Sequence, residues 1–189
     1  MAVSELTPED KKVLLKVARR AIESRLTGGA LFQQAGQVSS RLRQKRGCFV
    51  TLHKKGDLRG CIGIIEPVRE LITGVEENAV HAAFSDTRFA PLQVDELDDI
   101  VLEISVLSVP EVLHYSDSED LKKKLKPGIH GVILSKGYRT ATFLPQVWEQ
   151  LSGKDVFLTQ LCLKAGLSGD CWKKNDIGVK VYTAEYFSE

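Results

Sequence analysis

The stretch Leu58–Ile65 combines an arginine, a thiol and two glycines with residues that are apolar enough to be buried. If it forms a β-strand, successive side chains alternate between two faces, and one face would carry Arg59, Cys61, Gly63 and Ile65. Arg59 and Cys61 would then lie roughly 6.6 Å apart along the strand. A guanidinium at that distance lowers a thiol pKa and favours the nucleophilic or metal-binding thiolate. We therefore predict a catalytic Cys61, with Arg59 binding an anionic group or lowering the thiol pKa.

The two glycines of this stretch support two interpretations. Glycine inside a strand often marks a place where a ligand approaches the backbone, which makes Gly60 and Gly63 candidate substrate-binding residues. Both glycines also suit a β-bulge, and a free cysteine in an apolar strand is most often a small buried hydrophobe. The sequence leaves the functional and the structural interpretation open.

The next segment supplies candidates for the second half of the site. A helix is expected to begin at Pro67, and polar residues follow it at three- and four-residue steps, as on one helix face: Asn78, His81, Ser85 and Arg88, with Asp86 beside them. Short connections keep neighbours adjacent in space, so this face should lie near Cys61. We predict His81 as the base toward Cys61 and Ser85, Asp86 and Arg88 as substrate-orienting residues. A structural role, with local capping and an Asp86–Arg88 pair, is the alternative.

His130 is the third catalytic candidate, because it lies between glycines in the turn Pro127–Gly131, where an imidazole can be exposed. A turn capped by His130 is the structural alternative. A metal site of Cys61, His81 and His130 would require the fold to gather residues far apart in sequence, and we predict none. The chain has neither the Gly-x-x-x-x-Gly-Lys loop nor the Gly-x-Gly-x-x-Gly motif, and we expect no cofactor.

Leu58-Arg59-Gly60-Cys61-Ile62-Gly63 resembles the signature of the AMMECR family. Further matching segments are His81–Leu92, Gly128–Val132, Ala141–Val147 and Leu161–Gly166. The resemblance covers nearly the whole chain and implies a compact α+β fold without a well-established activity. Prokaryotic members are often encoded beside a Memo-like protein and a radical S-adenosylmethionine protein. The resemblance therefore implies a shared modification pathway and these two proteins as partners.

The bulk composition excludes several classes of protein. With 189 residues and a net charge of +1, the chain has no global field that attracts nucleic acid or membranes. Two basic clusters, Arg41–Arg46 and Lys122–Lys124, either form solvent-exposed surface or contact RNA. No apolar run reaches membrane-spanning length and no signal core follows Met1, so we expect a cytoplasmic protein. The four cysteines form no Cys-x-x-Cys pair, so we expect free thiols in a reducing compartment.

The periodicity predicts an α+β fold, with a mostly antiparallel or mixed sheet built from hairpins and flanked by four to five helices. Thr7 and Pro8 should open a helix that ends at Gly28, and Cys48–His53 should pair with the Cys61 strand in a hairpin. A late strand is expected over Ile177–Phe187. We expect residues 1–189 to form a single domain of the AMMECR type, with room for a small subdomain formed by inserted segments.

Three functions fit these features. The first is an enzyme, or an accessory subunit of one, with Cys61 in a cleft and an unknown small-molecule or protein substrate. The second is a non-catalytic interaction module that presents the Arg59–Gly63 surface to a protein partner. The third is RNA binding through the two basic clusters, which the near-neutral charge disfavours. The sequence does not decide whether the chain is an enzyme.

Overall fold

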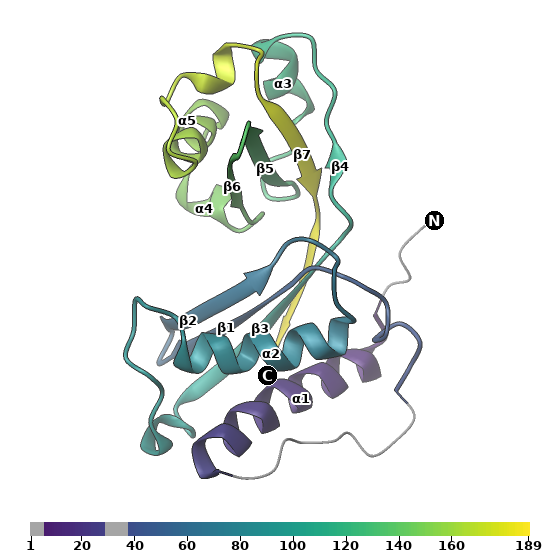
Figure 1. The fold of residues 1–189 in the computed structure, drawn as a ribbon, viewed down its shortest axis with the longest axis vertical. Coiled ribbons are helices and arrows are strands. Elements are labelled where there is room, and N and C mark those ends of the chain that lie inside the picture. Colours follow the sequence, from purple (N-terminus) through teal and green to yellow (C-terminus); the bar gives the residue numbers. More distant parts are fainter. Residues whose placement is uncertain (1–5, 29–37) are drawn as a thin grey trace. The chain divides into compact units, whose positions relative to one another are not determined.

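The computed structural model describes residues 6–28 and 38–189, which form two compact units (Figure 1). The first unit contains the described residues up to Val109 together with Glu185–Glu189, and the second is Pro110–Ala184. The chain thus leaves the first unit after Val109 and returns to it at Glu185. Each unit has its own hydrophobic core and is described by itself.

The first unit begins with α1 (Pro8–Thr27), whose ends are those expected from the sequence. The Thr7 hydroxyl accepts a hydrogen bond from the Asp10 backbone N–H, and the Asp10 carboxylate accepts one from the Thr7 N–H. This reciprocal cap satisfies two N–H groups that the helix leaves unpaired. Gly28 ends the helix at φ +67°, a left-handed conformation that favours glycine.

The first sheet has the strand order β2-β1-β3-β8. The predicted hairpin is confirmed: β1 (Cys48–Lys54) and β2 (Asp57–Ile64) are antiparallel, joined by a turn in which Lys55 and Gly56 both have positive φ. On its other side β1 pairs antiparallel with β3 (Ile100–Leu107). Because β2 is an edge strand, one side of its backbone faces away from the sheet.

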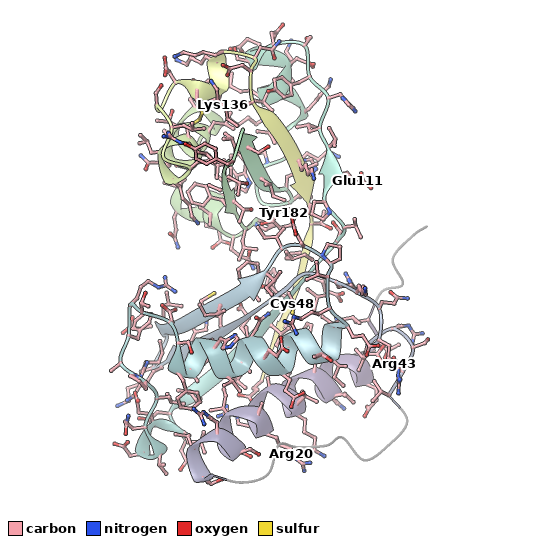
Figure 2. All side chains as sticks on the ribbon, viewed as in Figure 1. Arg20, Arg43, Cys48, Glu111, Lys136 and Tyr182 are labelled. Carbon is pink, nitrogen blue, oxygen red and sulfur yellow. A yellow bond between two sulfur atoms is a disulfide. The ribbon has the colours of Figure 1, made fainter. Side chains whose placement is uncertain are left out.

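Both α-helices of the first unit pack on the same face of this sheet, with α2 (Leu71–Phe84) over β1 and β2 (Figure 1). We name this the helix face. Its core side chains include Val50, Leu52 and Leu102 from the strands and Val75 and Ala79 from α2. Cys48 also lies on this face of β1 (Figure 2) and is buried.

The predicted start of the second helix at Pro67 is wrong. The helix begins at Leu71, and the residues before it form a bend and an isolated bridge between Lys45 and Glu70. The predicted polar helix face is also wrong. Asn78 is buried and donates to the Cys48 carbonyl, and Arg88 lies beyond the end of the helix at Phe84.

The predicted late strand is two strands in two sheets. β7 (Gly178–Tyr182) belongs to the second unit, and β8 (Ala184–Ser188) pairs with β3 in the first sheet. Tyr182, labelled at the end of β7 in Figure 2, is buried in its own unit, where its hydroxyl bonds with Thr142. Alternation over Ile177–Phe187 could not reveal the change of sheet, because both pieces are extended.

The second sheet has the order β4-β7-β5-β6, from β4 (Glu111–Val112), β7, β5 (Gly131–Lys136) and β6 (Arg139–Phe143). Three helices complete this unit: α3 (Ser118–Lys124), α4 (Val147–Gln150) and α5 (Lys154–Lys164). Two short 3-10 helices occur as well, η1 (Val94–Glu96) in the first unit and η2 (Cys171–Lys173) in the second.

The expectation of four free thiols is wrong. A disulfide joins Cys162 on α5 to Cys171 on η2, with the two Cα atoms 6.2 Å apart, while Cys48 and Cys61 are free. Both half-cystines lie in the core of the second unit beside Trp172. The prediction relied on the lack of a Cys-x-x-Cys pair, but the fold brings together two cysteines nine positions apart.

The fold class is confirmed as α+β. The described residues form five α-helices and two four-stranded sheets, and the pairings β1–β2, β1–β3 and β5–β6 are antiparallel. Among these five helices, none has the length and apolar character needed to cross a membrane.

Candidate functional site

The candidate site lies on β2 and begins with a β-bulge. The ladder pairs Leu52 with Gly60 and His53 with Leu58, so Arg59 is an extra residue without a partner on β1. The bulge interrupts the alternation that was predicted to place Arg59 and Cys61 as neighbours on one face. It shifts Leu58 to the face of His53, while Gly60 stays on the helix face.

Arg59 is bound by an acidic residue that the sequence did not single out. Its Nε and Nη2 donate to the two carboxylate oxygens of Glu96 at 3.0 and 2.8 Å, and Lys54 donates to the same carboxylate. These bonds, led by those from Arg59, lower the pKa of Glu96 to about 2. The guanidinium also lies 6.0 Å from the centre of the Phe89 ring. Arg59 is thus largely buried and already neutralised.

Cys61 is held by hydrogen bonds at its backbone N–H and at its sulfur. Its N–H, which faces the open edge of β2, donates to Asp86 Oδ2 at 2.9 Å. Asp86 in turn accepts a bidentate pair of bonds from Arg88 at 2.9 and 2.7 Å. These bonds, led by the pair from Arg88, hold the pKa of Asp86 well below its usual range. The Thr51 hydroxyl donates to Cys61 Sγ at 3.2 Å.

The predicted lowering of the Cys61 pKa is wrong. Burial is the largest influence and raises the pKa of the thiol, with smaller contributions in the same direction from Asp86 and Glu103. The hydrogen bond from Thr51 and the charge of Arg88 act in the opposite direction without reversing the shift. The guanidinium that acts on Cys61 is therefore Arg88, whereas Arg59 is paired with Glu96. At neutral pH Cys61 is a protonated thiol.

Both signature glycines have packing reasons for lacking a side chain. A Cβ on Gly60 would lie 2.2 Å from the carbonyl oxygen of Ala82, which shows how closely α2 approaches β2. A Cβ on Gly63 would lie 2.3 Å from the Phe49 ring across the ladder. These contacts account for the two glycines, and their role in substrate binding stays a prediction.

His81 and Cys61 lie on opposite sides of the sheet. The thiol contacts Thr51, whose neighbours Val50 and Leu52 point to the helix face, so Cys61 Sγ lies on the other face. His81 is exposed on α2, which covers the helix face. Ser85 is an exposed residue at the end of α2, where its N–H donates to the His81 carbonyl. The arrangement gives no support to a direct Cys61–His81 pair.

His130 belongs to the second unit, whereas Cys61 belongs to the first. Its Nδ1 accepts a hydrogen bond from the Lys126 backbone N–H, and its carbonyl accepts one from Trp148 Nε1. Burial, and the nearby Lys126 charge, lower the pKa of His130. The imidazole therefore caps its own turn, which was the structural alternative. Its catalytic role stays a prediction.

Three further polar residues share the sheet face of Cys61 and were not predicted as site residues. Thr51 lies opposite Cys61 on β1 and opposite Glu103 on β3, while His53 is two residues beyond Thr51 and opposite Val101. We name this surface the Cys61 face, formed by Phe49, Thr51, His53, Leu58, Cys61, Val101 and Glu103. The predicted hairpin, with the polar residues of both arms aligned, could have identified Thr51 and His53.

The two basic clusters are partly neutralised. Arg41 lies 3.5 Å from Asp10, and the Arg46 guanidinium donates to the Leu107 carbonyl. Lys122 and Lys124 form ion pairs with acidic residues of α3, and Lys122 also pairs with Asp155. Within residues 6–28 and 38–189, no three His, Cys, Asp or Glu side chains are arranged to hold a metal ion.

Comparison with known proteins gives one consistent result. A family model described as AMMECR1 matches residues 15–187. A protein of Methanothermobacter thermautotrophicus is 40% identical over 190 residues, covering 100% of this chain and 99% of its own length. A protein of Thermococcus onnurineus is 39% identical over 186 residues, covering 93% and 88%. The crystal structure of the uncharacterized protein PH0010 from Pyrococcus horikoshii matches with a TM-score of 0.90 at 36% identity, covering 97% and 93%.

Proposed function

This chain belongs to the AMMECR1 family, and on that premise we propose that it is an accessory subunit in a modification pathway, binding a protein partner through the Cys61 face. The resemblance suggests the radical S-adenosylmethionine protein or the Memo-like protein as that partner. The proposal combines two of the functions considered from the sequence, the enzyme accessory subunit and the interaction module.

The observation that carries the proposal is the exposed apolar surface on the Cys61 face. Leu58 and Val101 flank His53 in one cross-strand row, with 42% and 45% of their surfaces exposed. Both α-helices of the first unit pack on the opposite, helix face. Exposed apolar side chains grouped on one face are typical of protein interaction sites. The row is therefore suited to a protein partner.

The pairing of Arg59 and Arg88 and the protonation of Cys61 favour an accessory role rather than an anion-binding catalytic centre. Arg59 and Arg88 each form a bidentate pair with a carboxylate inside the first unit. The Cys61 thiol has a raised pKa. Neither arginine offers an uncompensated charge to an anionic substrate, and the thiol is not a preformed thiolate.

The test is a binding experiment between the purified chain and each of the two candidate partners from the same genome. Val101→Asp places a charge in the apolar row and should reduce partner recovery at least about tenfold, since a desolvated unpaired charge at an interface costs several kcal/mol. Val156→Asp is the matched control, because Val156 on α5 is similarly exposed at 49% but belongs to the second unit. Equal recovery of the Val101 and Val156 variants would refute the proposed surface.

Arg59→Ala is less suitable for this test. The substitution would leave the largely buried Glu96 paired only with Lys54 and would disturb the first unit itself. The ion pairs at Arg41, Lys122 and Lys124 count against RNA binding, the third function considered from the sequence.

A further inference from the structure

The Cys61 face carries an imidazole and a carboxylate as well as its thiol. The pairing Cys61–Thr51–Glu103 runs across β2, β1 and β3, and His53 follows Thr51 on the same face of β1. Among the described residues, none forms a hydrogen bond with the His53 imidazole. The side chain is half-buried.

The register brings these three groups within reach of one another. Diagonal neighbours on one face of an antiparallel pair have Cβ atoms roughly 7 Å apart, a separation that aromatic and long side chains span. His53 is diagonal to Cys61 on one side and to Glu103 on the other. The Glu103 charge already acts on the Cys61 thiol. His53 is therefore the imidazole that neighbours both groups on this face, two residues along β1 from Thr51, which lies between them.

We propose that Cys61, His53 and Glu103 form a thiol–imidazole–carboxylate site that accepts an acyl group from an activated ester or thioester. This inference rests on the Cys61 face of the proposed function and adds a class of substrate to it. His53 replaces His81 and His130 as the base, and Glu103 is a positioning residue that orients the imidazole.

The acyl-transfer step follows the usual nucleophile–base scheme. Cys61 Sγ attacks the carbonyl carbon of the substrate, and the new S–C bond forms as the bond from that carbon to the leaving oxygen or sulfur breaks. The thiol proton passes to His53 and from there to the leaving group. The product is an acyl thioester on Cys61, which a water or amine nucleophile then cleaves.

The resting arrangement explains why the thiol needs a base. Sγ accepts a hydrogen bond from Thr51, and burial raises the pKa of the thiol, so little thiolate is present at neutral pH. The charged groups acting on the sulfur are Arg88 and Asp86, from the segment after α2, and Glu103 from β3. A half-buried imidazole on the same face is suited to remove the proton as an electrophile approaches.

The experiment treats the full chain with p-nitrophenyl acetate as the acyl donor. Acetylation of Cys61 is measured over time by peptide mass spectrometry. His53→Gln should slow acetylation by about tenfold at neutral pH. This effect is smaller than the roughly hundredfold or greater contribution of a general base that is already positioned against its proton. His81→Gln is the matched control and should react at the wild-type rate. Buried Cys48 should stay unmodified in every folded sample.

Glu103→Gln separates positioning from general structural damage. The Glu103 charge contributes to the raised pKa of the Cys61 thiol, so removing it lowers that pKa and should move the midpoint of the pH–rate profile to lower pH. Equal rates for wild type and His53→Gln, or acetylation of Cys61 only after denaturation, would overturn the inference. Because partner binding is measured with Val101→Asp, a failed acetylation leaves that proposal standing, and failed partner binding leaves the acylation site standing.

Discussion

Asp86 should hold the edge strand β2 through a bond that its partner Arg88 does not make. The Asp86 carboxylate is buried and accepts the N–H of Cys61 on the edge strand, whereas the side chain of Arg88 is 55% exposed. Removing Asp86 leaves the Cys61 N–H without its acceptor, whereas removing Arg88 keeps that bond and takes two hydrogen bonds from the buried Asp86 carboxylate. The comparison of Asp86→Ala with Arg88→Ala therefore isolates the bond to β2.

The expected magnitudes follow from the two environments. Asp86→Ala removes a charge-assisted bond to a backbone N–H, worth about 1.5–3 kcal/mol, and leaves that N–H without its partner. It also abolishes the ion pair with Arg88, whose guanidinium is readily rehydrated because it is exposed. Arg88→Ala leaves the buried Asp86 carboxylate without its cation, with the backbone N–H groups of Cys61 and Arg88 as its remaining donors, and should itself cost roughly 1–3 kcal/mol. Both variants should therefore destabilise the first unit, and the bond to β2 is distinguished by hydrogen exchange at Cys61.

The assay is urea unfolding followed by far-UV circular dichroism, combined with hydrogen exchange of peptides covering Leu58–Ile64. Tryptophan fluorescence alone is unsuitable, because Trp148 and Trp172 both lie in the second unit. Both variants should lower the unfolding midpoint, whereas Asp86→Ala alone removes the acceptor of the Cys61 N–H and should speed exchange there the more. Equal acceleration of exchange at Cys61 in the two variants would refute the assigned Asp86–Cys61 bond.

The two remaining predictions concern acid stability and the disulfide. Glu96 has its pKa lowered from 4.5 to about 2 in the folded chain, so its contribution is complete above pH 4.5 and is lost as pH falls toward 2. In acid titrations of stability, Glu96→Gln should flatten this part of the curve, and an unchanged curve would contradict the Arg59–Glu96 pairing. The Cys162–Cys171 disulfide closes a short loop and should stabilise the second unit by about 2.5 kcal/mol. Dithiothreitol should therefore lower the urea midpoint seen by tryptophan fluorescence, while a chain with both cysteines replaced by alanine should not respond.

Part of the candidate site could be predicted from residue patterns in the sequence. Alternation correctly separated the buried residues of β1 from Phe49, Thr51 and His53, and the turn at Lys55–Gly56 correctly indicated the hairpin. Gly60 and Gly63 were predicted as positions where a ligand approaches the backbone, and the neighbours that the structure shows there are Ala82 of α2 and the Phe49 ring. The partner of Arg59 was not predicted, because Glu96 is distant in sequence and no local pattern connects the two.

The sequence by itself determined the local elements of this protein: the capped helix α1, the hairpin, and the α+β class. These depend on interactions between residues close in the chain, such as the bonds between Thr7 and Asp10. Tertiary structure decided which side chains meet. A single bulged residue, Arg59, changes the face on which a preceding side chain lies, and the layer of strands separates His81 from the thiol. Such relations depend on register and on layer order, which arise only when distant segments pack together.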